Sequence, residues 1–180
     1  ALLVGGALCV LMNHADRVQL PQLAQLVNAI GAIRTEPGGP AWRQPIFHPF
    51  ALAARHARGQ ALRSVVSSPS GHSREGLELP WLVASATHDE GTGRTAVFAL
   101  NRHLTHAQDL RIDLHGFTGP LELHQAVELS SADLHATNTA AQPFAVAPRQ
   151  HGQVDMSGER LRARLAPASW NVFVLQGRGP

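Results

Sequence analysis

The chain has 180 residues, 44% of them hydrophobic, so it can bury a core and fold as one domain or slightly more. Its longest apolar run, residues 1–12, is shorter than the roughly 18 residues that a membrane-spanning helix needs, which excludes a membrane partner. The 15 basic residues, all arginines scattered singly, exceed the 13 acidic ones by two, so a basic surface for nucleic acid is excluded as well.

The first element that the sequence predicts is an apolar helix over residues 1–12, followed by a polar turn at residues 13–17. This helix begins without an initiator Met and without a capping Ser, Thr, Asp or Asn. Because it is apolar nearly all round, it needs cover on more than one side. We therefore expect the sequence to be a fragment of a longer protein, with Cys9 as a packing residue of the helix.

The next elements follow the order expected of an α/β repeat. Residues 18–28 are rich in Leu and Val and predict a strand, and the Pro- and Gly-rich residues 31–40 predict a loop. Apolar residues at helical spacing then predict a helix over residues 41–59, kinked at Pro49 and ended by Gly59. Helix, strand and helix in the first 60 residues are typical of a repeating α/β fold.

Beyond Gly59 the helical spacing disappears and short strand-like runs alternate with turn residues. The turn at residues 89–94 predicts a hairpin between its flanking strands, and residues 67–76 and 130–142 predict exposed loops. Eight strands without helices are typical of a β-sandwich. The predicted strands cover residues 61–66, 79–88, 95–101, 108–114, 119–128, 144–147, 160–165 and 169–176.

Several kinds of active site are not supported by the spacing of reactive residues. The eleven histidines contain no His-Glu-x-x-His pattern, and His103 and His106 are isolated in a predicted loop, so we expect no metal site. No Gly-x-Ser-x-Gly motif is present, and the Gly-Thr-Gly run at residues 91–93 opens no helix, so neither a serine nucleophile nor a dinucleotide cofactor is indicated.

The acidic residues could in principle supply the carboxylate pair that hydrolysis of a glycosidic bond requires. However, Asp89 and Glu90 lie in the predicted hairpin turn. The other strand carboxylates alternate with apolar residues, as solvated positions do; they are Asp109, Asp113, Glu122 and Glu128. We therefore name no catalytic residue in this chain.

Two amides stand out, Gln25 and Asn28, because they lie at the end of an apolar predicted strand. A buried amide without a hydrogen-bond partner costs about 1–3 kcal/mol, so each needs either a backbone partner or a ligand. In a barrel of alternating strands and helices, ligands bind at the C-terminal strand ends. Both readings, a satisfied core amide and a substrate ligand, are open from the residues alone.

Longer motifs resemble one known family. They are residues 1–6, His14-Ala15-Asp16-Arg17-Val18, Leu23-Ala24-Gln25-Leu26-Val27-Asn28, residues 35–44 with Thr-Glu-Pro-Gly-Gly-Pro-Ala-Trp-Arg-Gln, Pro49-Phe50, residues 98–102 and Ser169-Trp170-Asn171-Val172. These runs resemble α-L-arabinofuranosidases of glycoside hydrolase family 51, over the whole chain and most strongly over the first 60 residues. The sequence departs from the family at His48, where Tyr is common.

The resemblance implies a multi-domain α/β plus all-β protein. Residues 1–59 would supply the last strand and the helices of a (β/α)8 catalytic barrel, and residues 60–180 an antiparallel β-sandwich. The family is retaining, with one Glu as general acid and a second as nucleophile about 5–5.5 Å away. Both glutamates would lie upstream of this chain. By similarity, Gln25 matches a glutamine that binds arabinofuranose. Asn28 and Trp42 are candidates to support the same site, and for Trp42 core packing is the favoured alternative.

The function implied is that of an exo-acting α-L-arabinofuranosidase, which releases terminal residues from arabinan- or arabinoxylan-type oligo- and polysaccharides in L-arabinose metabolism. Members of the family are commonly hexameric and intracellular, so a cytoplasmic homo-oligomer without a cofactor is expected. The alternative is a non-catalytic β-sandwich that acts as a scaffold or binds carbohydrate. Sugar-binding sandwiches expose coplanar aromatic residues, whereas this half has no Tyr and only Trp81 and Trp170, both in apolar strands.

Overall fold

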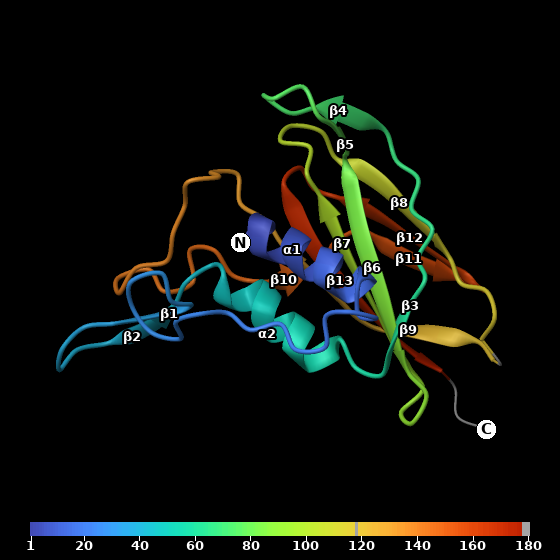
Figure 1. The fold of residues 1–180 in the computed structure, drawn as a ribbon, viewed down its shortest axis with the longest axis horizontal. Coiled ribbons are helices and arrows are strands. Elements are labelled where there is room, and N and C mark those ends of the chain that lie inside the picture. Colours follow the sequence, from blue (N-terminus) through green and yellow to red (C-terminus); the bar gives the residue numbers. More distant parts are fainter. Residues whose placement is uncertain (118, 178–180) are drawn as a thin grey trace.

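The computed structural model describes residues 1–117 and 119–177, which form a β-sandwich with two helices on one face (Figure 1). The larger sheet has the strand order β10-β9-β13-β7-β6-β3, and the smaller sheet has the order β11-β12-β8. Two hairpins, β1-β2 and β4-β5, lie outside both sheets, and all strand pairs are antiparallel. The elements are α1 (Leu2–Asn13), β1 (Ile33–Thr35), β2 (Ala41–Arg43), α2 (Phe47–His56), β3 (Gln60–Leu62), β4 (Ser70–His72), β5 (Glu78–Pro80), β6 (Leu82–Asp89), β7 (Arg94–Asn101), β8 (Gln108–Asp113), β9 (Leu121–Leu129), β10 (Arg149–Gln150), β11 (Val154–Ser157), β12 (Arg160–Leu165) and β13 (Ser169–Gly177).

The two central strands of the larger sheet, β7 and β13, are buried on both faces. Their side chains alternate, so Val97 and Phe173 point toward the smaller sheet, whereas Phe98 and Trp170 point toward the helices. This two-sided burial explains why both strands are almost continuously apolar.

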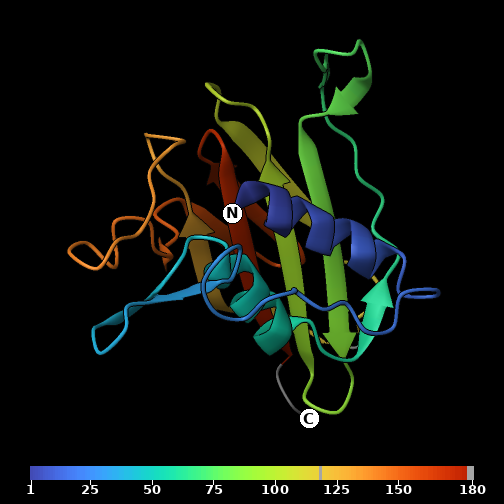
Figure 2. The same cartoon turned by 60° about the vertical axis from the view of Figure 1, so that its left-hand side comes forward.

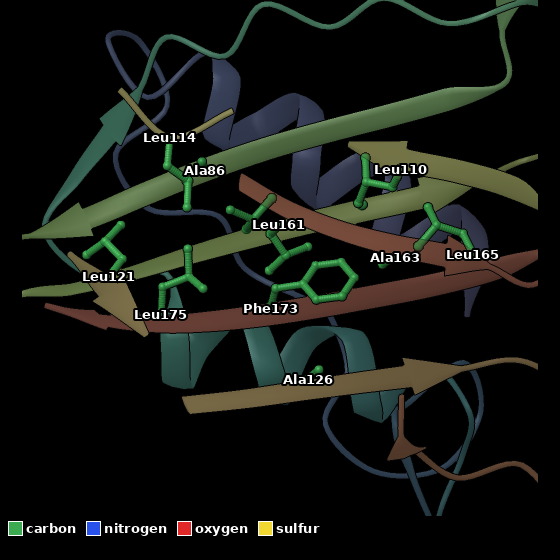
Figure 3. Close-up of a cluster of buried hydrophobic side chains, with 12 residues drawn as sticks. Ala86, Leu110, Leu114, Leu121, Ala126, Leu161, Ala163, Leu165, Phe173 and Leu175 are labelled. Carbon is green, nitrogen blue, oxygen red and sulfur yellow. The ribbon is translucent and has the colours of Figure 1, made fainter. Parts of the chain in front are cut away.

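The core between the two sheets contains the side chains drawn in Figure 3. Phe173 and Leu175 of β13 meet Leu161 and Leu165 of β12 there, and all four are fully buried. The smaller sheet presents one apolar face to this core and its charged face to solvent, which is the alternation seen along β12.

On the opposite face of the larger sheet, α1 lies across β6 and β7, with α2 beside it (Figure 2). Leu8 and Cys9 of α1 are buried against Phe98 and Trp170, whose rings stack with centroids 5.8 Å apart. Burial raises the pKa of the Cys9 thiol, in keeping with the packing role expected for it.

The strand predictions for the central part of the sandwich are confirmed. The predicted strand over residues 160–165 coincides with β12, and those over residues 95–101, 108–114, 119–128 and 169–176 match β7, β8, β9 and β13 to within two residues. The predicted hairpin is present as well, because Asp89 pairs with Arg94 at its end. The antiparallel β-sandwich expected for the second half of the chain is therefore correct.

The helix predicted over residues 41–59 is present in part as α2, but other local predictions after the first helix are wrong. The loop and helix expected over residues 31–59 contain the β1-β2 hairpin, and helix α2 begins only at Phe47. Pro49 causes no kink, since it lies in the first turn of α2, where a backbone N–H has no helical partner to lose. The hairpin β4-β5 and strand β11 were not expected.

The predicted strand over residues 144–147 is also absent, although Val146 is buried. Both backbone polar groups of Val146 bond to the side chain of Asn138: its N–H donates to Oδ1 at 2.7 Å, and its carbonyl accepts from Nδ2 at 2.9 Å. An asparagine amide thus takes the place of a neighbouring strand.

Gly5 provides a test of the helix-to-sheet contact. A methyl group at Gly5 would overlap the indole ring of Trp170, which is fully buried and cannot move aside. Alanine is the better helix former by about 1 kcal/mol, but overpacking of a core costs about 1–3 kcal/mol. We expect Gly5→Ala to lower the free energy of unfolding, as measured by urea denaturation. Gly152→Ala is the matched control, because nothing lies within 4 Å of its methyl position; equal stability of the two variants would contradict the contact.

Candidate functional site

The residues that the sequence singled out lie around the β1-β2 hairpin. Arg34 of β1 is opposite Trp42 of β2, and the preceding chain joins the edge of β1 through a single parallel bridge between Val27 and Ile33. The Asn28 N–H donates to the Ile33 carbonyl at 2.7 Å, and the Ile33 N–H donates to the Leu26 carbonyl at 3.1 Å. The chain around Val27 and the strands β1 and β2 thus form one small unit, which contains Gln25, Asn28 and Trp42.

The strand predicted over residues 18–28 is wrong. Among the described residues only Val27 of this segment makes a β-bridge, and the rest of it is irregular. A strand needs a ladder of backbone partners, and Pro21 donates none. Leu20 and Leu26 are largely exposed, so much of the apolar surface of this segment is uncovered in the described structure.

Gln25 and Asn28 have different surroundings in this unit. The Gln25 side chain is exposed and has no hydrogen-bond partner within the described part of the chain. Asn28 bonds to Thr35 twice: Nδ2 donates to the Thr35 hydroxyl at 2.9 Å, and Oδ1 accepts from the Thr35 N–H at 2.8 Å. Its φ of 58° is a left-handed conformation that asparagine tolerates well. Asn28 therefore fixes the turn that follows Gln25, and the Gln25 amide is free to bond to another group.

Trp42 is half-buried and its indole is held by the long loop of residues 130–148, which connects β9 to β10 and is named the β9–β10 loop below. Trp42 Nε1 donates to the main-chain carbonyl of Asn138 at 2.9 Å, and Gln44 Nε2 donates to the same carbonyl at 3.1 Å. The main-chain carbonyl of Asn138 in the β9–β10 loop thus holds one side chain of the hairpin and one that directly follows it.

Asn138 is a functional candidate that the sequence analysis missed. It was included only in an exposed loop, yet it is 2% exposed and uses its amide in three hydrogen bonds. Nδ2 donates to the carbonyls of Arg43 and Val146, and Oδ1 accepts from the Val146 N–H. No spacing in the sequence signals these bonds, because the partner Arg43 is 95 residues away.

His48 of α2 borders the same loop and is 8% exposed. Burial lowers its pKa, the nearby Arg43 guanidinium lowers it further, and a hydrogen bond with the backbone of Val146 partly opposes both effects. His48 is therefore held in its neutral form beside the Asn138 contact.

Glu128 is the one acidic residue among the described residues that is buried, which corrects the expectation of a solvated strand position. Burial opposes its ionisation, but hydrogen bonds from Arg149 at 2.7 Å and from the Ser130 hydroxyl at 2.8 Å lower its pKa overall. His151 Nε2 lies 4.0 Å from its second oxygen. The negative charge of Glu128 is thus balanced by Arg149, and the residue has a structural role.

His103 and His106, which were expected to be isolated in a loop, contact each other. His103 Nε2 lies 3.0 Å from His106 Nδ1, and His103 Nδ1 accepts hydrogen bonds from the N–H groups of Thr105 and His106. The His103 side chain thereby closes the turn that follows β7. Within residues 1–117 and 119–177, no group of three or more His, Cys, Asp or Glu side chains comes together.

The described helices are also too short or too polar to cross a membrane. The fold is a β-sandwich module with two helices on one face and two hairpins outside its sheets.

Comparison with known proteins identifies the family of this module. The model of the α-L-arabinofuranosidase C-terminal domain matches residues 1–169, and the chain belongs to that family. This result confirms the resemblance to glycoside hydrolase family 51.

Relatives of known activity match along nearly the whole chain. An intracellular exo-α-(1→5)-L-arabinofuranosidase of Halalkalibacterium halodurans is 42% identical over 97% of the chain and 34% of its own length. An exo-α-(1→6)-L-arabinofuranosidase of Bifidobacterium longum is 37% identical over 96% of the chain and 33% of its own length. A solved family 51 α-L-arabinofuranosidase from Bifidobacterium longum superposes with a TM-score of 0.92 at 39% identity, covering 98% of this chain and 34% of that one. The chain thus spans about a third of the length of these relatives.

The lowered pKa of His48 makes the stability of this region depend on pH. The unfolded chain takes up a proton near pH 6.5, whereas folded His48 does so only at lower pH, so the free energy of unfolding falls as the pH drops below that value. His48→Gln should make the loss of stability between about pH 7.5 and about pH 5.5 smaller, though not zero, because burial also lowers the pKa of His56 and His151. Thermal unfolding at several pH values measures this. A pH profile of His48→Gln equal to that of the unchanged protein would contradict the assignment.

Proposed function

We propose that this chain is the C-terminal part of a retaining, exo-acting α-L-arabinofuranosidase that removes terminal α-L-arabinofuranosyl residues from arabinan- or arabinoxylan-type glycans in L-arabinose metabolism. The observation that carries the proposal is that nearly the whole chain matches about a third of the length of each of several enzymes named for this activity. The relatives differ in linkage, so the proposal concerns the terminal sugar and not the bond position.

A second observation supports the proposal that a catalytic domain outside this chain packs against it. One side of α1 packs on the sandwich, and the opposite side presents Leu3, Ala7 and Val10 to solvent, with Leu3 86% exposed. Leu20, Leu26 and Ile30 of the following segment are each at least two-thirds exposed. Monomeric proteins rarely leave so much apolar surface uncovered. We propose that the remainder of a (β/α)8 barrel covers it, and that residues 1–59 belong to that barrel while residues 60–180 form the sandwich domain.

The chemistry then falls to groups outside this chain. A retaining glycosidase needs a carboxylic acid and a carboxylate about 5–5.5 Å apart. The buried Glu128 is neutralised by Arg149, and no acidic residue of the chain matches either catalytic position of the family. We therefore assign both catalytic glutamates to the upstream part of the protein.

Gln25, Asn28 and Trp42 are proposed as the contribution of this chain to the sugar site. The unbonded, exposed amide of Gln25 is able to donate to and accept from sugar hydroxyls. Asn28 fixes the turn beside it through Thr35, and Trp42 is a partly exposed aromatic residue of the neighbouring hairpin. Neither a metal nor a cofactor is needed for this role.

The alternative is that the chain acts as a non-catalytic sandwich. As an independent carbohydrate binder it would need exposed aromatic platforms, but Trp170 is fully buried, and Trp81 is half-buried beneath Gly71 and against His103, with ring centroids 4.6 Å apart. A scaffolding role is therefore the better supported form of this alternative. The homo-oligomer, a hexamer, and the cytoplasmic location expected from the family are kept as parts of the main proposal.

The assignment of both catalytic glutamates to the upstream part of the protein can be tested by activity measurements. The full-length protein should hydrolyse 4-nitrophenyl α-L-arabinofuranoside, and purified residues 1–180 should not, because they lack both catalytic carboxylates. Release of 4-nitrophenol is the readout. Activity of residues 1–180 alone would refute the assignment, and inactivity of the full-length protein on every arabinofuranoside would refute the function.

Gln25 can be tested in the full-length protein. Gln25→Ala should lower kcat/KM by about ten-fold or more, since a lost hydrogen bond to a substrate contributes about 1–2 kcal/mol, while the unfolding temperature should stay the same because the side chain bonds to nothing in this chain. Gln22→Ala, an exposed glutamine of the same segment, is the matched control. Kinetics of Gln25→Ala equal to those of the control would remove Gln25 from the site.

A further inference from the structure

The β9–β10 loop is the longest irregular connection within the sandwich, and it reaches away from both sheets to the β1-β2 hairpin (Figures 1 and 2). Loops of this length without secondary structure are commonly functional. Here the loop contacts the segment that carries a proposed sugar-binding residue, although the two lie about a hundred residues apart in the sequence.

Asn138 makes hydrogen bonds that join the loop to the hairpin segment. Its carbonyl accepts from the Trp42 indole and the Gln44 amide, and its own amide donates to the carbonyl of Arg43 between them. The same amide bonds twice to Val146, which closes the loop on itself. Three successive residues, 42 to 44, are therefore fixed by one buried asparagine that is itself fixed by its loop.

The consequence for Trp42 is geometric. A tryptophan ring can rotate about two side-chain torsions, and the hydrogen bond from Nε1 to a fixed carbonyl selects one orientation. Trp42 is only partly buried, and its ring is then held in one orientation, as a contact between the ring and a sugar would require. A ring that is oriented in advance binds more tightly, because less rotational freedom is lost on binding.

We propose that Asn138 is a positioning residue of the arabinofuranosidase site: the sandwich, through the β9–β10 loop, orients Trp42 for contact with the arabinofuranosyl-bearing glycan. This inference rests on the proposed function and extends it, since it makes the C-terminal domain a determinant of substrate affinity. Asn138 acts through Trp42 and does not touch the substrate.

The experiment uses the full-length protein with 4-nitrophenyl α-L-arabinofuranoside and with an arabino-oligosaccharide. Asn138→Ala removes the amide that holds the loop to Arg43 and Val146, so Trp42 loses its fixed acceptor. We expect KM to rise about five- to ten-fold with kcat nearly unchanged, as for a lost binding contact. Hydrogen exchange of residues 33–43 should also become faster. Thr137→Ala, an exposed neighbour in the same loop whose hydroxyl makes no hydrogen bond within the described residues, is the control and should change neither quantity.

A double-mutant cycle separates positioning from general destabilisation. Trp42→Phe keeps an aromatic ring but cannot donate to the Asn138 carbonyl, and it should raise KM by a similar factor. In this background Asn138→Ala should have little further effect on KM, because the two residues act along one path. If Asn138→Ala does not fold, the KM of Trp42→Phe compared with that of Thr137→Ala still tests the hydrogen bond from the Trp42 indole to Asn138.

The outcomes distinguish this inference from the function on which it rests. Wild-type activity combined with faster exchange but an unchanged KM in Asn138→Ala would overturn the positioning role and leave the function standing. Additive effects of Asn138→Ala and Trp42→Phe on KM, or an unchanged KM in Trp42→Phe, would overturn it as well. A wild-type protein inactive on both substrates would overturn the proposed function, and the inference with it.

Discussion

The structure depends on the burial of β7 and β13 on both of their faces. Each strand contributes alternate side chains to two separate cores, one shared with the smaller sheet and one shared with the helices. A shift in register by one residue would exchange the two sets, placing Phe98 against the smaller sheet and Val97 against α1. The size differences along both strands therefore fix the register, and the register in turn fixes where α1, α2 and the hairpin can lie.

This constraint explains which parts of the fold the sequence predicted. Strands such as β7, β12 and β13 are specified by local patterns, either a continuous apolar run or strict alternation, and a short window is enough to recognise them. Residues 18–28 have the composition of a strand but depend on partners that the described chain does not supply. Composition indicates what a segment is able to form, whereas pairing requires neighbours that lie elsewhere in the protein.

The candidate site was predictable only in part, for a related reason. Gln25 and Asn28 were singled out because an amide beside apolar residues needs a partner, and the partner of Asn28 is Thr35, only seven residues away. Asn138 has the same chemistry, but its key contacts join it to Arg43, Trp42 and Gln44. A hydrogen bond between a side chain and a distant backbone atom leaves no periodic trace in a sequence, so the tertiary structure was needed to find it.

Helix α1 has a consequence for how such enzymes can be recombined. It precedes the expected domain boundary at Gly59, yet Gly5, Leu8 and Cys9 complete the hydrophobic core of the sandwich. A chimera joined at Gly59 would pair one protein's Trp170 with another protein's helix, so it would succeed only where both parents have the same small residue opposite the indole. In a chimera, the sandwich and α1 should therefore be exchanged together. A junction placed before the helix keeps the contacts between α1 and the sandwich within one parent.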